Sequence, residues 1–289
     1  MYKQCESQIE TLRCLNSDDG SFKYILQLSD GNQIETVFIP EQQNTAKICI
    51  SNQIGCFNKC AYCATGMLHY IRDMSANEIV GQLHHVLNNH LMNNLSLNDL
   101  GVLFMGMGEP FFNYENVVLA IRAIEKIDFS TPIKTNVIVS TSGIVPGIIR
   151  FSDEHVSARL AVSINPPNDL LRSSIMPINK IYPLQDVLSA CQYYTSTTQN
   201  RIIIEYILLA DFNDDIEHAA ELTDKLAHLP CEIQLIPFNS FRQARYTTPS
   251  ESDIKKFKSV LEAKGFHVSL KPSYGQDILG GCGQLGGEQ

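Results

Sequence analysis

Three cysteines lie close together in one short loop, at the spacing C-x3-C-x2-C: Cys56, Cys60 and Cys63. Thiolates are soft ligands that bind zinc or iron–sulfur clusters. A closed structural zinc site takes four protein ligands, and this loop offers three. A four-iron cluster bound by three cysteines instead keeps one iron open to an outside ligand. The spacing therefore favours an iron–sulfur centre, and we expect the chain to fold around it.

Length and composition indicate one large domain. The chain has 289 residues, 44% of them hydrophobic, which suffices for one α/β core. No apolar run approaches the roughly 20 residues of a membrane span, and the first residues form no apolar signal segment. We expect a cytoplasmic protein with no membrane partner, in which nine cysteines build no disulfide framework. The net charge of −9 counts against a broad nucleic-acid surface.

Residues 1–44 predict a small β extension. Residues 22–28 and 33–39 alternate in apolar character, and residues 29–32 (SDGN) between them are a turn signal. The expected structure is an N-terminal β-hairpin.

Residues 45–275 alternate between expected strands and expected helices. Strands are expected over residues 47–50, 100–105, 135–139, 159–163, 201–209, 232–236 and 266–270, and helices over residues 75–92, 115–126, 184–194, 216–229 and 252–264. Ser75 followed by Glu78 has the pattern of a capping box at the start of the first helix. About six βα units in sequence predict an α/β fold with a partial parallel β/α barrel. A glycine-rich C-terminal stretch, residues 276–289, follows the barrel.

Polar motifs follow the expected strands at the point where each strand ends. They are the cysteine loop and residues 106–109 (GMGE), 140–142 (STS), 163–165 (SIN) and 238–239 (FN). In parallel barrels the carboxyl ends of the strands carry the active site. Five motifs on one rim describe a ligand-binding mouth better than five unrelated turns.

Each of these motifs also has a purely structural interpretation. The glycines of residues 106–108 let the backbone approach a ligand and Glu109 can accept hydrogen bonds from an ammonium group, but a strand-to-helix turn would use the same residues. Ser140 and Asn165 can bind a ribose or a carboxylate, although a serine in such a place more often caps the next helix. Asn239 can meet an adenine or a ribose, or it can be a turn residue.

Two further cysteines stand apart from the loop. Cys282 lies in a glycine-rich segment, residues 280–287, with little side chain to pack against. A buried structural cysteine normally sits in a packed element, whereas a flexible segment can carry a thiol into a site, so a reactive role is favoured for Cys282. Cys49 lies on the strand that leads into the loop, and by itself it indicates only a core residue.

Taken together, these residues resemble the radical SAM superfamily and, within it, the RNA-modifying adenine methyl synthases of the RlmN/Cfr type. In such proteins the open iron chelates the amino and carboxylate groups of S-adenosylmethionine (SAM), and a glycine–glutamate segment holds the amino group. The similar segments are residues 35–40 (ETVFIP), 49–56 (CISNQIGC), 60–63 (CAYC), 104–110 (FMGMGEP), 139–143 (VSTSG), 168–169 (ND), 176–180 (MPINK), 204–206 (IEY), 281–285 (GCGQL) and Asn239.

The resemblance implies two cofactors and their contacts. Cys56, Cys60 and Cys63 would bind a [4Fe–4S] cluster, and SAM would bind beside it. The implied SAM-binding residues are Gly108, Glu109, Ser140, Ser163, Asn165 and Asn239.

The resemblance also implies a covalent mechanism. Cys282 would take a methyl group from one SAM, and a radical made from a second SAM would abstract hydrogen from that methyl group. The carbon radical would add to a ring carbon of adenine in RNA, with C2 favoured over C8. Glu35 would remove the ring proton, and Cys49 would form a disulfide with Cys282 to release the product. Adenine C2 and C8 are poor nucleophiles, which explains the radical route.

The implied partners are an RNA substrate, ribosomal or transfer, and a flavodoxin- or ferredoxin-type reductant. Three departures from the family are visible. The family's N-terminal accessory domain is lacking, its histidine after the fourth strand is Asn165, and its basic C-terminal extension is missing after Cys282. The alternatives are a relative that acts on a smaller substrate or at C8, and a non-catalytic iron–sulfur protein.

Overall fold

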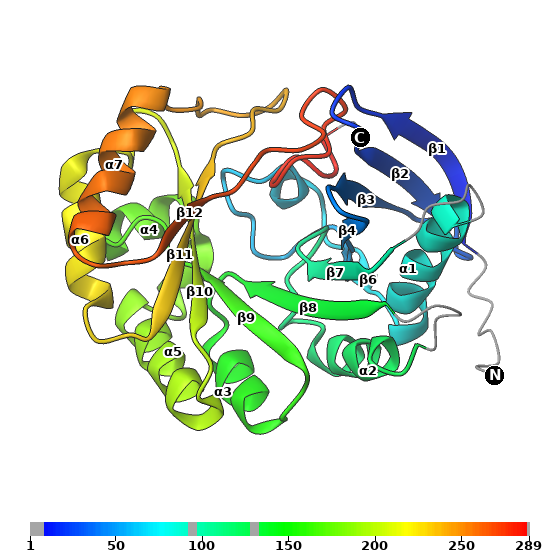
Figure 1. The fold of residues 1–289 in the computed structure, drawn as a ribbon, viewed down its shortest axis with the longest axis horizontal. Coiled ribbons are helices and arrows are strands. Elements are labelled where there is room, and N and C mark those ends of the chain that lie inside the picture. Colours follow the sequence, from blue (N-terminus) through cyan, green and yellow to red (C-terminus); the bar gives the residue numbers. More distant parts are fainter. Residues whose placement is uncertain (1–8, 92–96, 128–132, 288–289) are drawn as a thin grey trace.

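The fold is built on one continuous sheet of ten strands. A computed structural model describes residues 9–91, 97–127 and 133–287 of the chain. The strand order is β1-β2-β3-β4-β7-β8-β9-β10-β11-β12, so that neighbours in sequence are almost always neighbours in the sheet. The sheet curves, and the helices lie on its outer side (Figure 1).

The N-terminal strands are antiparallel. They are β1 (Glu10–Asn16), β2 (Phe22–Gln27) and β3 (Gln33–Glu41), followed by β4 (Thr45–Cys49). Strands β2 and β3 are the hairpin expected from the sequence, with Phe22 opposite Phe38 and Gln27 opposite Gln33. Strand β1 was not expected. Because β3 also pairs with β4, the extension and the barrel share one sheet.

From β4 onward all strand pairs of this sheet are parallel. The remaining strands are β7 (Asp99–Phe104), β8 (Lys134–Thr141), β9 (Ala158–Ser163), β10 (Ile202–Leu208), β11 (Cys231–Pro237) and β12 (Val268–Leu270). Strands β1 and β12 end the sheet order, so the described strands form a partial barrel. The predicted α/β fold with a parallel sheet is confirmed.

Most helices connect successive parallel strands. They are α1 (Ala76–Leu91), α2 (Tyr114–Ile124), α3 (Val145–Asp153), α4 (Asp169–Ile175), α5 (Leu184–Thr198), α6 (Ile216–Leu226) and α7 (Glu251–Ala263). Short 3-10 helices, η1 (Ala64–Met67) and η2 (Pro177–Lys180), and a two-stranded ribbon of β5 (Gln53–Ile54) and β6 (Arg72–Asp73) complete the fold. Helices α3 and α4 were not expected. The last residue of the helix expected over residues 75–92 lies outside the described residues.

Local sequence explains where several helices begin. At α1 the backbone N–H of Ser75 donates to Glu78 at 2.8 Å and the N–H of Glu78 donates to Ser75 Oγ at 3.3 Å, which confirms the capping box. Asn168 caps α4 and Ser250 caps α7 through their side-chain oxygens.

The core lies between the sheet and these helices. Strand β10 is buried at every position, as expected for a parallel strand covered on both faces. Among the described residues, no helix has the length and apolar character needed to cross a bilayer.

The C-terminal segment returns from β12 to the N-terminal strands, as Figure 1 shows in red and blue. The backbone N–H of Gly275 donates to Asp19 at 2.6 Å, and Ser17 Oγ donates to Asp277 at 2.5 Å. The turn between β1 and β2 therefore holds the start of this segment, which we call the tail (residues 271–287).

Candidate active site

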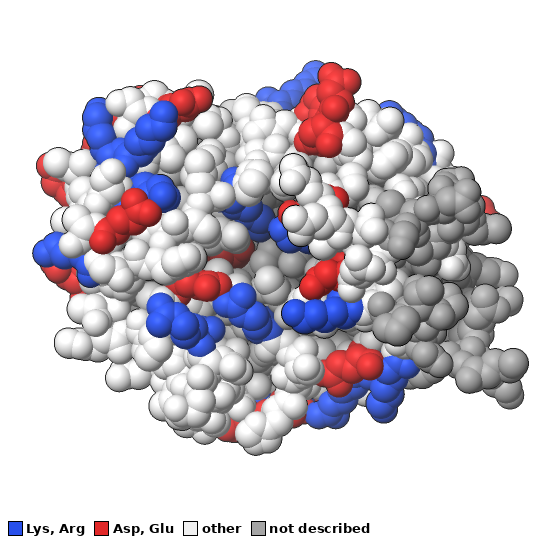
Figure 2. Space-filling view, in the orientation of Figure 1, with Lys and Arg blue, Asp and Glu red and all other residues white. Residues whose placement is uncertain are grey.

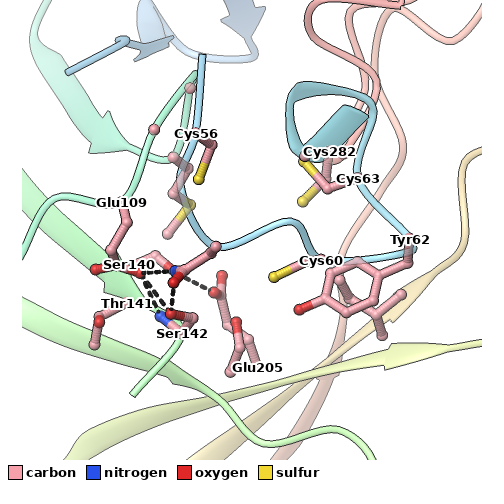
Figure 3. Close-up of a pocket in the computed structure, with 18 of the residues that line it drawn as sticks. Cys56, Cys60, Tyr62, Cys63, Glu109, Ser140, Thr141, Ser142, Glu205 and Cys282 are labelled. Carbon is pink, nitrogen blue, oxygen red and sulfur yellow. Dashed lines mark hydrogen bonds between the residues drawn. The ribbon is translucent and has the colours of Figure 1, made fainter. Parts of the chain in front are cut away.

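A pocket of about 130 Å³ lies at the carboxyl ends of the parallel strands, as the strand-end motifs predicted. We call it the loop pocket, because the cysteine loop forms one of its walls. Its lining includes Cys56, Cys60, Cys63, Gly108, Glu109, Ser140, Ser163 and Cys282. Figure 3 shows the three loop thiols directed into it, with Cys282 beside Cys63.

The backbone of the cysteine loop depends on two unusual conformations. Gly55 has a φ of +76°, and a Cβ atom there would lie 2.0 Å from the carbonyl oxygen of His69, so glycine is required. Lys59 is also left-handed, with a φ of 51°. The N–H of Ala61 donates to Ile175 O at 2.8 Å, which ties the loop to the end of α4.

The donor set of the loop fits an iron–sulfur cluster. Burial raises the pKa of all three thiols, that of Cys56 to about 12, so these groups need a nearby positive charge to become thiolates. Within the described residues, no three ligating side chains converge closely enough to hold one metal ion. The thiols instead surround the pocket, which fits a cluster whose cysteines bind different irons.

Two glycines let the segment after β7 pass close to the loop. A Cβ atom on Gly106 would lie 2.6 Å from the carbonyl of Ile50, and one on Gly108 would lie 2.5 Å from Gln53 Cβ. Gly108 also has a φ of +101°. This close approach places the Glu109 carboxylate in the wall of the loop pocket.

The Glu109 carboxylate is buried and surrounded by donors. It accepts hydrogen bonds from Ser142 N (2.8 Å), Ser142 Oγ (2.7 Å), Asn58 Nδ2 (3.2 Å) and Phe111 N (3.1 Å). Burial raises the pKa of Glu109, although the bonds from Ser142 and Phe111 oppose that rise. A carboxylate fixed in this way can receive an ammonium group.

Other polar atoms on the pocket wall are available to a ligand. Ser140 Oγ donates to Glu205, and Glu205 lies 3.7 Å from Lys271 Nζ. Asn58 Oδ1 and Glu205 Oε1 are buried and accept no hydrogen bond from any described residue. A ligand rich in donors, such as an amino acid joined to a ribose, would satisfy both oxygens.

Arg172 holds together the ends of two strands beside the loop pocket. Its guanidinium is fully buried and donates to Ser142 O (2.8 Å), Ser163 O (2.9 Å) and Asn179 Oδ1 (3.0 Å). Burial lowers the pKa of Arg172. Because one planar side chain bonds the ends of both β8 and β9, it fixes the spacing between Ser142 and Ser163.

The tail is held against the cysteine loop rather than flexible. Asn239 Nδ2 donates to Cys282 O at 3.0 Å, and the N–H of Ala64 donates to Gly283 O at 2.7 Å. Thr65 Oγ1 donates to Leu285 O at 2.7 Å. These bonds explain how a glycine-rich segment with few side chains brings a thiol to a defined place.

A buried ion pair of the N-terminal strands anchors the tail on both sides of Cys282. Lys23 and Glu35 are both almost fully buried and lie 3.4 Å apart. Lys23 Nζ donates to Leu279 O at 3.3 Å, and Glu35 Oε2 accepts from the N–H of Gly286 at 2.9 Å. The carboxylate of Glu35 thus contacts the tail backbone and is absent from the lining of the loop pocket.

A second cavity, of about 190 Å³, lies on the other side of Cys282 and we call it the tail cavity. Cys49, Lys271 and Cys282 all line it, whereas Cys49 does not line the loop pocket. Both cysteines are free thiols in this structure. Burial raises the pKa of Cys49 to about 12, although Lys271 opposes the rise.

The structure separates the predicted site residues into two groups. Eight line the loop pocket: Cys56, Cys60, Cys63, Gly108, Glu109, Ser140, Ser163 and Cys282. Asn165 is fully buried outside the lining, with its Nδ2 atom 3.8 Å from Met176 Sδ, and Asn239 holds the tail instead.

Several functional candidates were missed by sequence reasoning. They are Asn58, Ser142, Arg172, Glu205 and Lys271. Glu205 carried a signal, because it is a charge inside an otherwise apolar, buried strand. Arg172 lies in a short helix of which only Arg172 and Ile175 are buried, so its segment gave no such signal. Asn58 and Ser142 lie inside motifs that the sequence singled out but were given no role of their own, and Lys271 follows the last strand.

Comparison with known proteins agrees with this geometry. Residues 53–223 match the family model of the radical SAM superfamily. The chain is 40% identical to the probable dual-specificity RNA methyltransferase RlmN of Dictyoglomus thermophilum, over 94% of this chain and 77% of the relative. It is 38% identical to the dual-specificity RNA methyltransferase RlmN of Pseudomonas fluorescens, over 94% and 72%. A crystal structure of a radical SAM methyltransferase from Sphaerobacter thermophilus superimposes with a TM-score of 0.90 at 35% identity, covering 96% of this chain and 81% of the other.

Proposed function

This chain belongs to the radical SAM superfamily and, within it, to the RlmN-type RNA methyltransferases, and we propose that it methylates a ring carbon of adenine in RNA, C2 in preference to C8. The observation that carries the proposal is the position of Cys282. Its thiol lies in the wall between a pocket lined by three cluster-type cysteines and a cavity that holds Cys49.

Members of this superfamily use a [4Fe–4S] cluster and SAM. Cys56, Cys60 and Cys63 would hold the cluster in the loop pocket, and Glu109 would bind the SAM amino group. Ser140 and Ser163 lie on the same wall, within reach of a ligand bound there. When bound, this pair of cofactors supplies a carbon radical that abstracts hydrogen.

Cys282 and Cys49 have different roles in the proposed methyl transfer. The thiol of Cys282 accepts a methyl group from SAM as a thioether and presents that methyl group to the loop pocket. After the methylene carbon has joined the base, the thiol of Cys49 attacks Cys282 Sγ. A disulfide forms, the electron pair of the carbon–sulfur bond goes to the methylene carbon, that carbon takes a proton to become the methyl group, and the methylated base leaves.

The proton on the adenine ring carbon must also be removed. The role of Glu35 as that base stays a prediction, since in this structure its carboxylate is engaged with Lys23 and Gly286. RNA as the substrate is supported by the named relatives, which are dual-specificity RNA methyltransferases, and ribosomal or transfer RNA stays a prediction. A flavodoxin- or ferredoxin-type protein is the proposed source of the electron.

Replacement of the resolving cysteine tests this function directly. In the Cys49→Ala variant the methylene bridge forms but cannot be broken, so RNA should stay attached to Cys282. We would express the variant in its host, strip it under denaturing conditions, and sequence the nucleic acid that remains bound. Mass spectrometry of the digested adduct would show whether C2 or C8 carries the bridge.

The matched control is the double variant Cys49→Ala/Cys282→Ala, which lacks the attachment point. RNA on the single variant alone supports the proposal and identifies the substrate. A single variant that keeps its cluster, cleaves SAM under strong reductant and carries no RNA would refute it.

A further inference from the structure

The tail cavity and the loop pocket are two parts of one barrel interior. On β8, Ile138 lines the tail cavity and Ser140, two residues later, lines the loop pocket. On β11, Gln234 and Ile236 are related in the same way. Side chains two apart on a strand point to the same face, so the tail cavity lies toward the amino ends of the strands.

Cys282 lies at the boundary between these two spaces. Together with Met105 it lines both, whereas Cys49 and Lys271 line the tail cavity alone. Lys47 also lines the tail cavity, and 42% of its side chain is exposed, so this cavity reaches solvent. A disulfide between Cys49 and Cys282 would therefore be reachable from the amino-end side while a ligand fills the loop pocket.

The proposed function requires such a route, because each turnover leaves Cys49 and Cys282 oxidised. Two electrons must return before Cys282 can accept another methyl group. Cys49 lies on an inner strand and faces the barrel interior, where a redox protein has no room to place its own cysteine. A small molecule fits a cavity of about 190 Å³.

We propose that the tail cavity is the binding site of a small-molecule thiol that reduces the Cys49–Cys282 disulfide from the amino-end side of the barrel. This inference rests on the proposed function. The walls combine apolar side chains, among them Ile39, Leu103 and Ile138, with the ammonium group of Lys271 at the inner end. That combination suits a short thiol with an apolar body.

The chemistry is two successive thiol–disulfide exchanges. The first thiolate attacks Cys49 Sγ, the Cys49–Cys282 bond breaks, and its electron pair leaves with Cys282 Sγ. A second thiolate attacks the outer sulfur of the mixed disulfide and releases Cys49. Two small thiols become one small disulfide, and each cysteine takes a proton from solvent.

Lys271 is placed to assist both exchanges. Burial alone would lower its pKa, but the acidic groups of Cys282, Glu205 and Cys49 around it raise the pKa above the ordinary value. Its ammonium group lies 3.3 Å from Met105 Sδ and 3.7 Å from Glu205. Lys271 lines the same cavity as both sulfurs, and Glu205, 3.7 Å from its ammonium group, is still an acidic neighbour when the two cysteines are joined. A positive charge there stabilises the thiolate that leaves in each step.

The test measures reduction of the disulfide in the cluster-loaded full-length protein under anaerobic conditions. The Cys49–Cys282 bond is first formed by a mild disulfide-forming oxidant and verified by peptide mass spectrometry. Reduction by 2-mercaptoethanol is then followed with and without saturating SAM. We expect SAM in the loop pocket to change the rate less than twofold.

Filling the tail cavity, unlike filling the loop pocket with SAM, should slow the reduction. Ile138→Trp places a large ring in it, and Gln234→Trp does so from the facing wall. We expect reduction by 2-mercaptoethanol to slow at least tenfold in either variant. Leu119→Trp, on the exposed side of α2, is the matched control and should reduce at the normal rate.

The opposite pattern would overturn the proposal. SAM that blocks reduction, tryptophan variants that leave the rate unchanged, or thioredoxin that outpaces the small thiol would each place the reductant elsewhere. If neither tryptophan variant folds, the SAM comparison alone decides. The RNA-trapping experiment with Cys49→Ala needs no thiol, so it tests the proposed function separately.

Discussion

Glu109 shows how a single side chain can be prepared for a ligand by its neighbours. Its carboxylate already accepts four hydrogen bonds, two of them from Ser142, and it is only 3% exposed. The bonds hold the carboxylate in one orientation before any ligand arrives. The ammonium group of SAM would bring a positive charge directly to this buried carboxylate.

We expect Glu109→Gln to weaken SAM binding by about 10- to 100-fold, since a hydrogen bond to a charged group contributes about 1.5–3 kcal/mol. Equilibrium dialysis with cluster-loaded protein measures this. Ser142→Ala is the control that keeps the carboxylate and removes one of its donors, and it should lose less affinity. Equal affinity of wild type and Glu109→Gln would show that Glu109 does not bind the amino group.

Cys49 should react with alkylating agents only at high pH. Burial raises its pKa to about 12, so its thiolate fraction is very small at pH 8 and grows about tenfold per pH unit below 12. We expect iodoacetamide to modify Cys49 with a rate that rises steadily between pH 8 and 10.5. Mass spectrometry of the Cys49 peptide measures the rate.

The Lys271→Gln variant provides the matched control for this pH profile. Lys271 lowers the pKa of Cys49, so its loss should move the profile to still higher pH. A rate that levels off near pH 9 in the wild type would contradict the expected pKa.

The residues that sequence reasoning identified share one property: their neighbours along the chain reveal them. The spacing of Cys56, Cys60 and Cys63 and the glycines before Glu109 are local patterns. Glu205 on β10 and Lys271 directly after β12, by contrast, are far apart in the sequence, and only the sheet order brings them within 3.7 Å. Long-range pairs of this kind leave no local pattern in a single sequence.

The N-terminal strands bind the backbone of the tail and hold it in place. Strands β2 and β3 supply Lys23 and Glu35, which bond the tail backbone on both sides of Cys282. The turn after β1 adds contacts to Gly275 and Asp277. The extension predicted only as a β-hairpin therefore positions the Cys282 thiol.

Breaking the buried pair should loosen the tail. Glu35→Leu removes the carboxylate that pairs with the buried Lys23 ammonium group, so we expect the free energy of unfolding to fall by about 3–5 kcal/mol. Urea denaturation measures this loss. The double variant Lys23→Met/Glu35→Leu removes both charges of the pair and should recover more than half of it. A Glu35→Leu protein as stable as the wild type would argue against the anchor.

Variants of Glu35 can distinguish a role in anchoring the tail from a role as catalytic base. In the proposed mechanism, methylation of Cys282 by SAM precedes any proton removal from adenine. An anchoring role predicts that Glu35→Leu slows this first methylation, whereas Glu35→Gln, which can still accept from Gly286, slows it less. A role as base alone leaves the first methylation unchanged in both variants.

Predictions of secondary structure succeeded where the local signal was strong. The capping box at Ser75 and the alternation around residues 29–32 placed α1 and the β2–β3 hairpin correctly. Strand β1 was missed because its side chains are mostly exposed and its sequence has no apolar alternation. Helix α4 is short, and much of its support comes from the buried contacts of Arg172.

The surface carries positive and negative side chains side by side. On the face in Figure 2, Lys and Arg are interspersed with Asp and Glu. On α7 two lysines are paired within the helix, Lys256 with Asp253 at 2.8 Å and Lys258 with Glu262 at 2.8 Å. The net charge of −9 opposes binding of phosphates over the surface as a whole.

Binding of RNA should therefore depend only weakly on salt. The slope of log K against log salt concentration is about −0.7 to −0.9 for each phosphate neutralised. We expect a slope of magnitude below about 3, which corresponds to no more than about four phosphate contacts. Fluorescence anisotropy with the RNA identified by the Cys49→Ala trap, at several salt concentrations, measures it.

If phosphate contacts are few, uncharged contacts should supply much of the affinity for RNA. Phe57, Tyr70 and Phe112 are exposed and meet edge to face next to the cysteine loop, with ring centroids 6.1–6.3 Å apart. Aromatic faces stack on unpaired bases with little dependence on salt. Phe57→Ala should weaken binding about equally at low and high salt, whereas Lys256→Gln should have little effect at either. A steep slope, or a strong loss in Lys256→Gln, would instead show that phosphate contacts dominate.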